Sequence, residues 1–195
     1  MFKYIYIVFA VWAFFNKVFV TKWIHRIDKI KGKVYGRKIT KLIYLFYPVP
    51  FIFSPVEFFL VERNINYYLS AFAFLAYISA WILSIKSIKT MGKYWTVDVE
   101  MRENHPLIKK GPYKYMRHPH YLFTFIELLG LPLIANAYYT FIVTAIIFIP
   151  LYTARITIEE KQMINKFGDK YRRYKKQVWG LFPIPIFKPG VKNEQ

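Results

Sequence analysis

The stretch that decides the fold is YLFTFIELLGLPLIANAYYTFIVTAIIFIPLYTA, residues Tyr121–Ala154, which carries one charge, Glu127, over 34 positions. A helix needs roughly 20 mainly apolar residues to cross a bilayer. The stretch is too long for one such helix and too short for two full helices with a loop. We therefore predict a tight helical hairpin, residues 121–135 and 138 onward, that turns near Asn136.

Three more apolar runs lie upstream, at Phe2–Val20, Leu42–Val61 and Ile65–Ile85. Each is long enough to span a bilayer. The sequence thus predicts an all-α fold, a polytopic membrane helix bundle with about five transmembrane helices. The second run must be kinked or broken, because proline removes an intrahelical donor and clashes with the preceding turn, and it contains Pro48, Pro50 and Pro55. Irregular backbone in a bilayer needs protein or a water-filled cavity to satisfy it, so we expect a cavity or a simple bend beside this run.

The positive charge is concentrated in three segments. Of the 29 Lys and Arg residues, 26 lie within 21–41, 86–120 and 155–195, and the formal net charge is +18. With five spans these segments share one face, which the positive-inside rule makes cytoplasmic, with the N-terminus outside. Topology and anionic lipid headgroups account for the charge, so nucleic acid is not an expected partner. We expect an integral protein of a prokaryotic cell membrane.

The sequence divides into an N-terminal part, 1–85, and a C-terminal part, 86–195. The first holds three membrane helices and a basic cytoplasmic linker, 21–41. The second holds a mostly irregular loop, the hairpin and a basic interfacial segment; the loop is 86–120 and the hairpin 121–165. In GDKYRRYKKQ, which follows the hairpin, we expect a helix at the membrane surface with its tyrosines facing inward.

The motif RHPHY, Arg117–Tyr121, stands directly before the hairpin. Proline at position 119 biases His118 away from helical geometry and is itself favoured in the first turn of a helix. Such a helix start offers unpaired amides to an anion, and Arg117 and His118 would complete a carboxylate or phosphate pocket. Alternatively, Arg117 reaches to headgroups and His118 only caps the helix.

A pair of adjacent carboxylates, Glu159 and Glu160, lies on the second helix of the hairpin. Successive helical positions are about 100° apart, so one can face a pocket while the other faces water or a cation. The alternative is a surface pair, with Arg155 four residues earlier as an ordinary salt-bridge partner of Glu159.

The combination of these motifs resembles the isoprenylcysteine carboxyl methyltransferase family of integral membrane enzymes. GPYKYMRHPHY is followed by a hydrophobic hairpin, by EE and by FGDKYRRYKK with FP; MGKYW and HPLIKKGPY stand upstream, and GLFPIPIFKPGVK resembles the family's C-terminal end. The resemblance covers about residues 91–192. Phospholipid N-methyltransferases look similar over the same region, and membrane sterol reductases share an RHP-containing part.

The resemblance implies S-adenosylmethionine bound at the cytoplasmic face by the loop and the hairpin. His105 would hold the adenosine, with backbone and apolar contacts from Leu107 and Ile108. The resemblance places the reacting end at Arg117 and Glu159. It adds the remaining cofactor-binding residues Tyr113, His118, Tyr121 and Glu160.

The residue types suit methyl transfer to a lipophilic acceptor, for which the carboxylate of a prenylcysteine-like or other isoprenoid acid is the leading prediction. Such a nucleophile arrives ionised, so the protein has mainly to orient two reactants, and an arginine can grip a carboxylate at two points. The four histidines are scattered and cysteine is absent, so we predict no metal site. The alternatives are a phospholipid N-methyltransferase, an NADPH-dependent sterol-type reductase and a non-enzymatic basic membrane scaffold.

Overall fold

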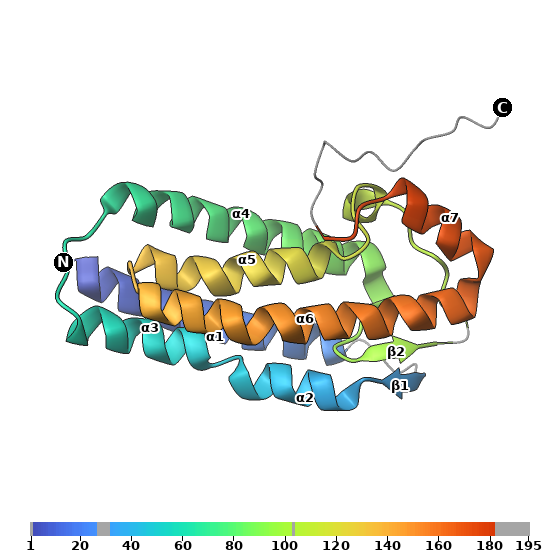
Figure 1. The fold of residues 1–195 in the computed structure, drawn as a ribbon, viewed down its shortest axis with the longest axis horizontal. Helices are drawn as coiled ribbons and strands as arrows, with labels where there is room; N and C mark the ends of the chain where they lie inside the picture. The colour runs from blue at the N-terminus through green and yellow to red at the C-terminus, as the bar shows by residue number, and fades with distance from the viewer. Residues whose placement is uncertain (1, 27–31, 103, 182–195) are drawn as a thin grey trace.

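The computed structural model describes residues 2–26, 32–102 and 104–181; most of the GLFPIPIFKPGVK stretch, residues 182–192, lies outside them. These residues form an elongated bundle of helices that run side by side along its length (Figure 1). The bundle helices are α1 Phe2–Arg26, α2 Arg37–Phe46, α3 Val49–Leu60, α4 Tyr67–Met91, α5 Pro119–Ile134 and α6 Tyr138–Phe167. At one end of the bundle lie the short helix α7, Asp169–Gln177, the 3-10 turns Gly92–Tyr94 and Gly111–Lys114, and the strands β1 Lys33–Tyr35 and β2 Val99–Met101.

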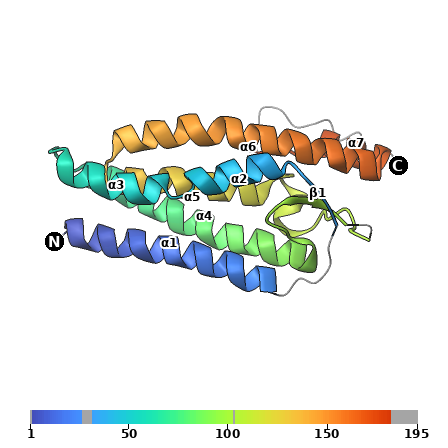
Figure 2. The ribbon, with the colours of Figure 1, turned by 90° about the horizontal axis from the view of Figure 1, so that it is seen from below.

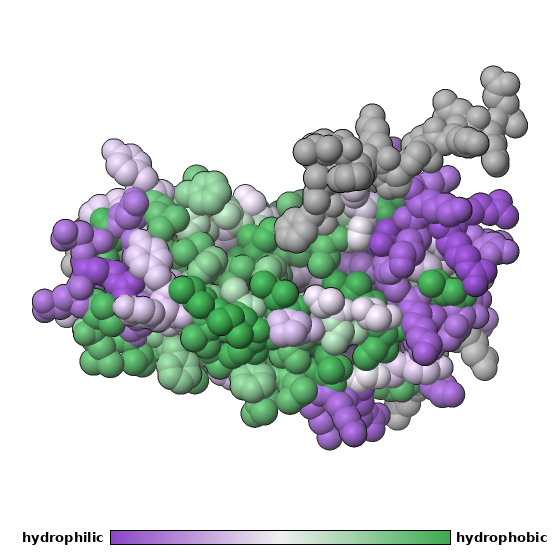
Figure 3. Space-filling model, viewed as in Figure 1, coloured by the Kyte–Doolittle hydropathy of each residue, from purple (hydrophilic) through white to green (hydrophobic). Residues whose placement is uncertain are grey.

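The predicted all-α membrane bundle is confirmed. Among the described residues, four helical segments are long and apolar enough to cross a membrane, at Phe2–Val20, Arg37–Leu60, Tyr67–Tyr94 and Tyr138–Phe167. The fifth predicted span, α5, is a shorter apolar helix of 16 residues. Apolar side chains face outward along the middle of the molecule, and hydrophilic residues gather at its two ends (Figure 3). This outward apolar band is the surface that a lipid bilayer requires.

The hairpin turns where the sequence predicted. Asn136 has a positive φ of 56°, a conformation that asparagine tolerates better than most residues. Its buried side chain holds the turn: Nδ2 donates to Ser70 Oγ over 2.8 Å, and Oδ1 accepts from the Asn66 amide over 2.9 Å and from the Tyr138 hydroxyl over 3.0 Å. The turn between α5 and α6 is thereby tied to the start of α4.

The second apolar run is broken, as its prolines predicted. Helix α2 ends at Phe46 and α3 begins at Val49, with Pro48 between them as the N-cap residue. In Figure 2 the two helices follow one another along the same side of the bundle. Pro55 lies inside α3 without ending it.

The predicted loop 86–120 contains more regular secondary structure than predicted. Helix α4 continues to Met91, so the first six residues of the predicted loop 86–120 are helical. Further along, β2 pairs antiparallel with β1 of the basic linker, Lys33 opposite Met101. Gly32 permits this pairing, because a Cβ there would lie 2.6 Å from the Met101 carbonyl oxygen. The sheet joins two segments that are far apart in sequence, and the local pattern of neither predicted it.

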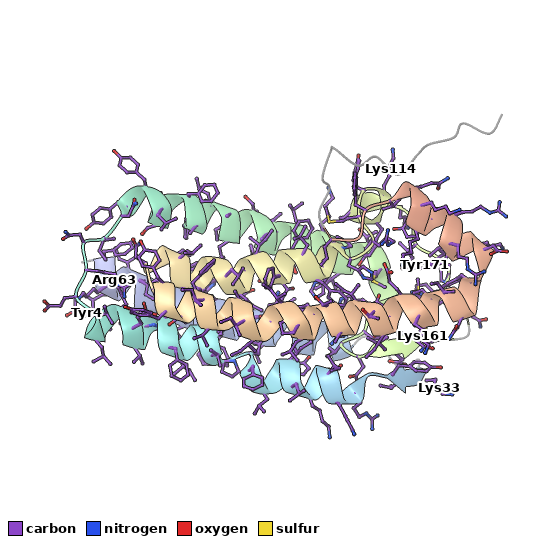
Figure 4. The ribbon with its side chains drawn as sticks, viewed as in Figure 1. Tyr4, Lys33, Arg63, Lys114, Lys161 and Tyr171 are labelled. Atoms are coloured by element: carbon purple, nitrogen blue, oxygen red, sulfur yellow. The ribbon has the colours of Figure 1, made fainter. Side chains whose placement is uncertain are left out.

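The two ends of the bundle differ in character. Figure 4 places Tyr4 and Arg63 at one end, and Lys33, Lys114, Lys161 and Tyr171 at the other. The second end holds the loop, the small sheet and α7. Helix α6 runs on into this end as predicted, up to Gly168, whose φ of 53° separates it from α7. On α7 the tyrosines Tyr171 and Tyr174 are buried, which confirms their predicted inward direction.

Candidate active site

A cavity of about 450 Å³ lies where the loop, α2, α5, α6 and α7 meet. This volume is in the range of pockets that bind small molecules. Its wall includes all of the predicted site residues except Glu160; these are His105, Leu107, Ile108, Tyr113, Arg117, His118, Tyr121 and Glu159. The cavity also reaches the break between α2 and α3, where Tyr47 and Pro48 line it. The expected cavity beside the second run is therefore present.

Arg117 and His118 lie directly before α5. His118 is the N-cap residue, with φ −124° and ψ 55°, outside helical geometry as the following proline predicts. Both backbone amides donate to residues that follow α7: Arg117 N to Trp179 O over 2.7 Å, and His118 N to Gly180 O over 3.2 Å. The start of α5 is thereby held against the chain that leaves α7.

Arg117 forms its ion pair with Glu160. Its Nε donates to Glu160 Oε1 over 2.8 Å, and its Nη1 donates to the carbonyls of Lys175, over 3.0 Å, and Val178. Glu160 also accepts from Lys175 Nζ over 2.5 Å and lies 3.3 Å from His118 Nε2. The side chain of Arg117 is 11% exposed. The guanidinium is therefore fixed by protein groups at the cavity wall and does not reach freely to headgroups.

Glu159 makes different contacts. It accepts a 2.5 Å hydrogen bond from the Tyr121 hydroxyl, which itself accepts a 2.9 Å bond from Arg155 Nε. His118 lies farther off, with Nδ1 3.9 Å from Glu159 Oε1. The hairpin thus brings Arg117 and Glu159 to one cavity, although the direct partner of Arg117 is the neighbouring glutamate.

Arg155 is a cavity residue that the sequence reasoning missed. It is buried, its Nη1 donates to Thr40 Oγ1 over 3.1 Å, and its Nη2 donates to the Val97 carbonyl. Within the described ranges Arg155 forms no direct ion pair with Glu159, so the alternative of an ordinary surface pair is wrong. The spacing of four residues was visible in the sequence. The burial of Arg155 was not, because it depends on α2 and on the loop.

His105 lies at the polar end of the cavity with neither ring nitrogen bonded to the described residues. The imidazole packs edge-on against Tyr94, with ring centroids 4.9 Å apart. Burial, together with the charges of Lys166 and Arg102, lowers its pKa to about 4. A neutral imidazole offers one donor and one acceptor, and buried polar atoms normally have partners. The unpaired nitrogens therefore suit a ligand that carries both donors and acceptors, as a purine ring does.

The rest of this end is apolar and aromatic. Leu107 packs against the buried cluster formed by Tyr171, Tyr174 and Val178. Tyr113 is buried, and its carbonyl accepts a 2.6 Å hydrogen bond from the Tyr174 hydroxyl. Burial raises the pKa of both the Tyr113 and the Tyr174 hydroxyl, so both stay neutral. Helix α7 thus closes the cavity over the loop.

At the opposite, membrane end, the wall includes Lys17 of α1 and His120 and Thr124 of α5. His120 Nδ1 lies 3.1 Å from Ser84 Oγ of α4. None of these residues was predicted as part of the site. A signal was present in the sequence, since Lys17 is a charge inside an apolar run and such charges are usually functional.

Comparison with known proteins agrees with the motifs. The sequence model of the isoprenylcysteine carboxyl methyltransferase (ICMT) family matches residues 72–165. The chain is 35% identical over 91 residues, 44% of its length, to the uncharacterized protein YpbQ of Bacillus subtilis. It is 27% identical over 154 residues, 78% of its length, to the protein-S-isoprenylcysteine O-methyltransferase of Schizosaccharomyces pombe. It spans only 54% of the first relative and 60% of the second.

A solved structure is similar as well. The eukaryotic intramembrane Ras methyltransferase ICMT superposes with a TM-score of 0.64 at 27% identity, over 75% of this chain and 54% of that one. The matched region includes the loop, the RHPHY motif, the hairpin and both glutamates. Residues 72–165 thus match the isoprenylcysteine carboxyl methyltransferase family, which is the resemblance that the motifs predicted.

Proposed function

We propose that this protein is an integral membrane methyltransferase that moves the methyl group of S-adenosylmethionine to a lipophilic acceptor, preferentially the carboxylate of an isoprenoid or other lipid acid. The observation that carries the proposal is the single cavity. It joins a polar end, at His105, Arg117 and Glu159, to a membrane end, at Phe14 and Tyr47. A water-soluble cofactor and a lipid-soluble acceptor can therefore meet inside one enclosed space.

The polar end fits the proposed cofactor. The unpaired nitrogens of His105 can bond the adenine, while Leu107, Ile108 and Tyr113 supply apolar and backbone contacts. His118 and Tyr121 complete the set, and Glu160, which does not line the cavity, acts by holding Arg117. When bound, S-adenosylmethionine supplies a methyl group that is already activated on a sulfonium. The chain has then to bind, align and shield the reactants, because correct orientation alone lowers the barrier by several kcal/mol.

At the reacting end we assign the main roles to Arg117 and Glu159. The bonds from Arg117 to Glu160 and to two carbonyls hold its guanidinium ready for an anionic group. Glu159 is oriented by the Tyr121 hydroxyl and places negative charge beside the cavity, where a sulfonium would be stabilised. A carboxylate acceptor needs no base. An amine or a neutral phenol would lose a proton, which Glu159 or His118 could accept.

The proposed orientation puts the N-terminus outside and the cavity mouth in the cytoplasm. Two features support it: the segregation of the cations, and the position of the N-terminal end of α1 at the opposite end of the bundle from α7 (Figure 1). The cytoplasmic side is where the cofactor would be available.

The test is to incubate membranes that contain the protein with labelled S-adenosylmethionine and a panel of lipophilic acids, phenols and amines. We expect labelled ester from an acid. Label on phospholipid amines would favour N-methylation instead. Purified protein should bind S-adenosylhomocysteine and not NADPH; the reverse would favour a reductase, and binding of neither would favour a scaffold.

A further inference from the structure

Two charged residues from different apolar runs meet inside the bundle. Lys17 of α1 lies with its Nζ 2.9 Å and 3.1 Å from the two carboxylate oxygens of Glu127 of α5, and 3.3 Å from Thr124 Oγ1. Burying such a pair costs several kcal/mol per ion before the two charges attract one another. Both charges interrupt otherwise apolar runs, so their presence calls for an explanation beyond packing.

The pair presents its positive member to the cavity. The wall includes Lys17 and Thr124 but not Glu127. The side chain of Lys17 is 14% exposed, whereas that of Glu127 is 3% exposed. A molecule in the membrane end of the cavity therefore meets an ammonium, while the carboxylate that balances it lies behind.

Further hydrogen-bonding groups line the same cavity as this ammonium. The hydroxyls of Tyr47 and Tyr152 and the Nε2 of His120 belong to residues of the cavity wall. In the part of the chain that the structure describes, none of these three atoms has a hydrogen-bond partner, and Tyr152 is a buried residue. These atoms line the cavity and are not among the fully buried atoms without a partner, so a molecule in the cavity can reach them. This part of the cavity is therefore built for a polar group rather than for a hydrocarbon chain alone.

We infer that Lys17 is an acceptor-binding residue that takes the carboxylate of a lipophilic acid. The inference rests on the proposed function and narrows its substrate class. Thr124 follows Tyr121 by three residues on the same helix, which is about 4.5 Å along the axis. A carboxylate on Lys17 thus lies within about one helical turn of the Tyr121–Glu159 contact. A cationic amine would meet Lys17 as a like charge, so Lys17 selects acids over phospholipid amines.

A purely structural role is the competing explanation, in which the pair only ties α1 to α5. The two roles differ in what each partner contributes. For a structural tie Lys17 and Glu127 matter equally. For acceptor binding Lys17 is needed, while Glu127 competes with the acceptor for the ammonium.

The experiment compares Glu127→Gln with the double variant Lys17→Met/Glu127→Gln, which removes both charges and leaves neither unpaired. Lys3→Met is the matched control, since it makes the same change on α1 outside the cavity. Each full-length protein is assayed in lipid nanodiscs with S-farnesylcysteine as acceptor. The primary amide of S-farnesylcysteine serves as a neutral competitor, and S-adenosylhomocysteine affinity is measured separately.

We expect the double variant to raise the acceptor KM at least tenfold and to lose the preference for acid over amide, with S-adenosylhomocysteine affinity within about twofold of wild type. Glu127→Gln should keep or strengthen the preference, and Lys3→Met should change nothing. An unchanged preference in the double variant overturns the inference. If that variant does not insert, Glu127→Gln decides alone: a lowered acceptor KM supports the inference and a raised one overturns it.

Failure of the inference can be told from failure of the proposed function. If wild-type protein methylates phenols or amines but no acid, the proposed role of Lys17 is wrong, while the proposed methyl transfer is supported. If wild-type protein transfers no methyl group to any acceptor, both fall.

Discussion

Adjacent glutamates in the hairpin have different partners, and this difference is visible only at the scale of single residues. Among the described residues, Glu160 contacts Arg117, His118 and Lys175, while Glu159 accepts a hydrogen bond from Tyr121 and lies 3.9 Å from His118. Their order on the helix predicted two directions. It did not predict which of them would meet the arginine, because that depends on where α7 returns the chain.

Arg117→Lys should reduce methyl transfer by about 10–100-fold. Lysine keeps the charge but cannot reproduce the planar guanidinium that contacts Glu160 and two carbonyls. Losing one charge-assisted hydrogen bond costs about 1.5–3 kcal/mol. The measurement is the initial rate at saturating cofactor. The control is Arg172→Lys, whose pair with Asp169 is exposed and therefore screened by water. Equal rates in both variants would remove Arg117 from the site.

Glu159→Gln and Glu160→Gln should fail in different ways. Glu160→Gln leaves Arg117 and Lys175 without their carboxylate. We therefore expect the free energy of unfolding to fall by roughly 1–3 kcal/mol, and the thermal midpoint to fall with it. Glu159→Gln should keep the fold, because only the contacts with Tyr121 and His118 change. It should lose turnover, because the negative charge beside the cavity is removed. Thermal unfolding in detergent and methyl-transfer rates, measured on the same samples, separate the two. Identical behaviour of the variants would contradict the division of roles.

At the scale of elements, local patterns were informative and long-range pairings were not. The apolar runs, the turn at Asn136 and the break at Pro48 each depend on a few neighbouring residues, and all were predicted. The pairing of β1 with β2 and the extension of α4 to Met91 were not. The residues of β1, β2 and the last turns of α4 lack a strong local pattern. The paired residues of the two strands are 64 to 68 positions apart in the sequence. The positions of Arg155 and Lys17 in the cavity wall depend on similar distant contacts.

The loop between α4 and α5 should become more protected when cofactor binds. Neither ring nitrogen of His105 has a hydrogen-bond partner among the described residues. The loop residues beside it line the cavity, so a bound ligand would add contacts to the loop. Hydrogen exchange with and without S-adenosylhomocysteine is the measurement, and we expect slower exchange across residues 105–121. The hairpin turn around Asn136 is the internal reference, since it lies at the far end of α5. Equal exchange in the loop with and without ligand would argue against a cofactor loop.

At the scale of the whole molecule, the outward apolar band and the two polar ends (Figure 3) fix how the bundle must sit in a bilayer. The sides on which the two termini lie depend on whether α5 crosses the bilayer. This helix has 16 residues and is therefore only about 24 Å long at 1.5 Å per residue. Ten of its residues are buried, so neighbouring helices, rather than lipid, surround most of it. A short fifth crossing is compatible with the proposed orientation.

The orientation predicts opposite locations for the two termini. Short tags at each end, probed with protease on intact cells and after lysis, should show the N-terminal tag cleaved outside and the C-terminal tag protected until lysis. A reporter inserted after Asn66 provides a third point, expected outside. Protection of both termini in intact cells would reject the five-crossing topology.

The contact between the start of α5 and the chain after α7 has a consequence for how the protein is made. The amide and guanidinium of Arg117 bond to Trp179 and Val178, and the second bond spans 61 positions of sequence. The ribosome therefore synthesises Arg117 61 positions before the Val178 carbonyl that holds it. Until residues 178–180 follow, the amides of Arg117 and His118 lack these partners, and this part of the cavity wall is incomplete. The wall of the proposed site can therefore be completed only after residues 178–180 have been synthesised.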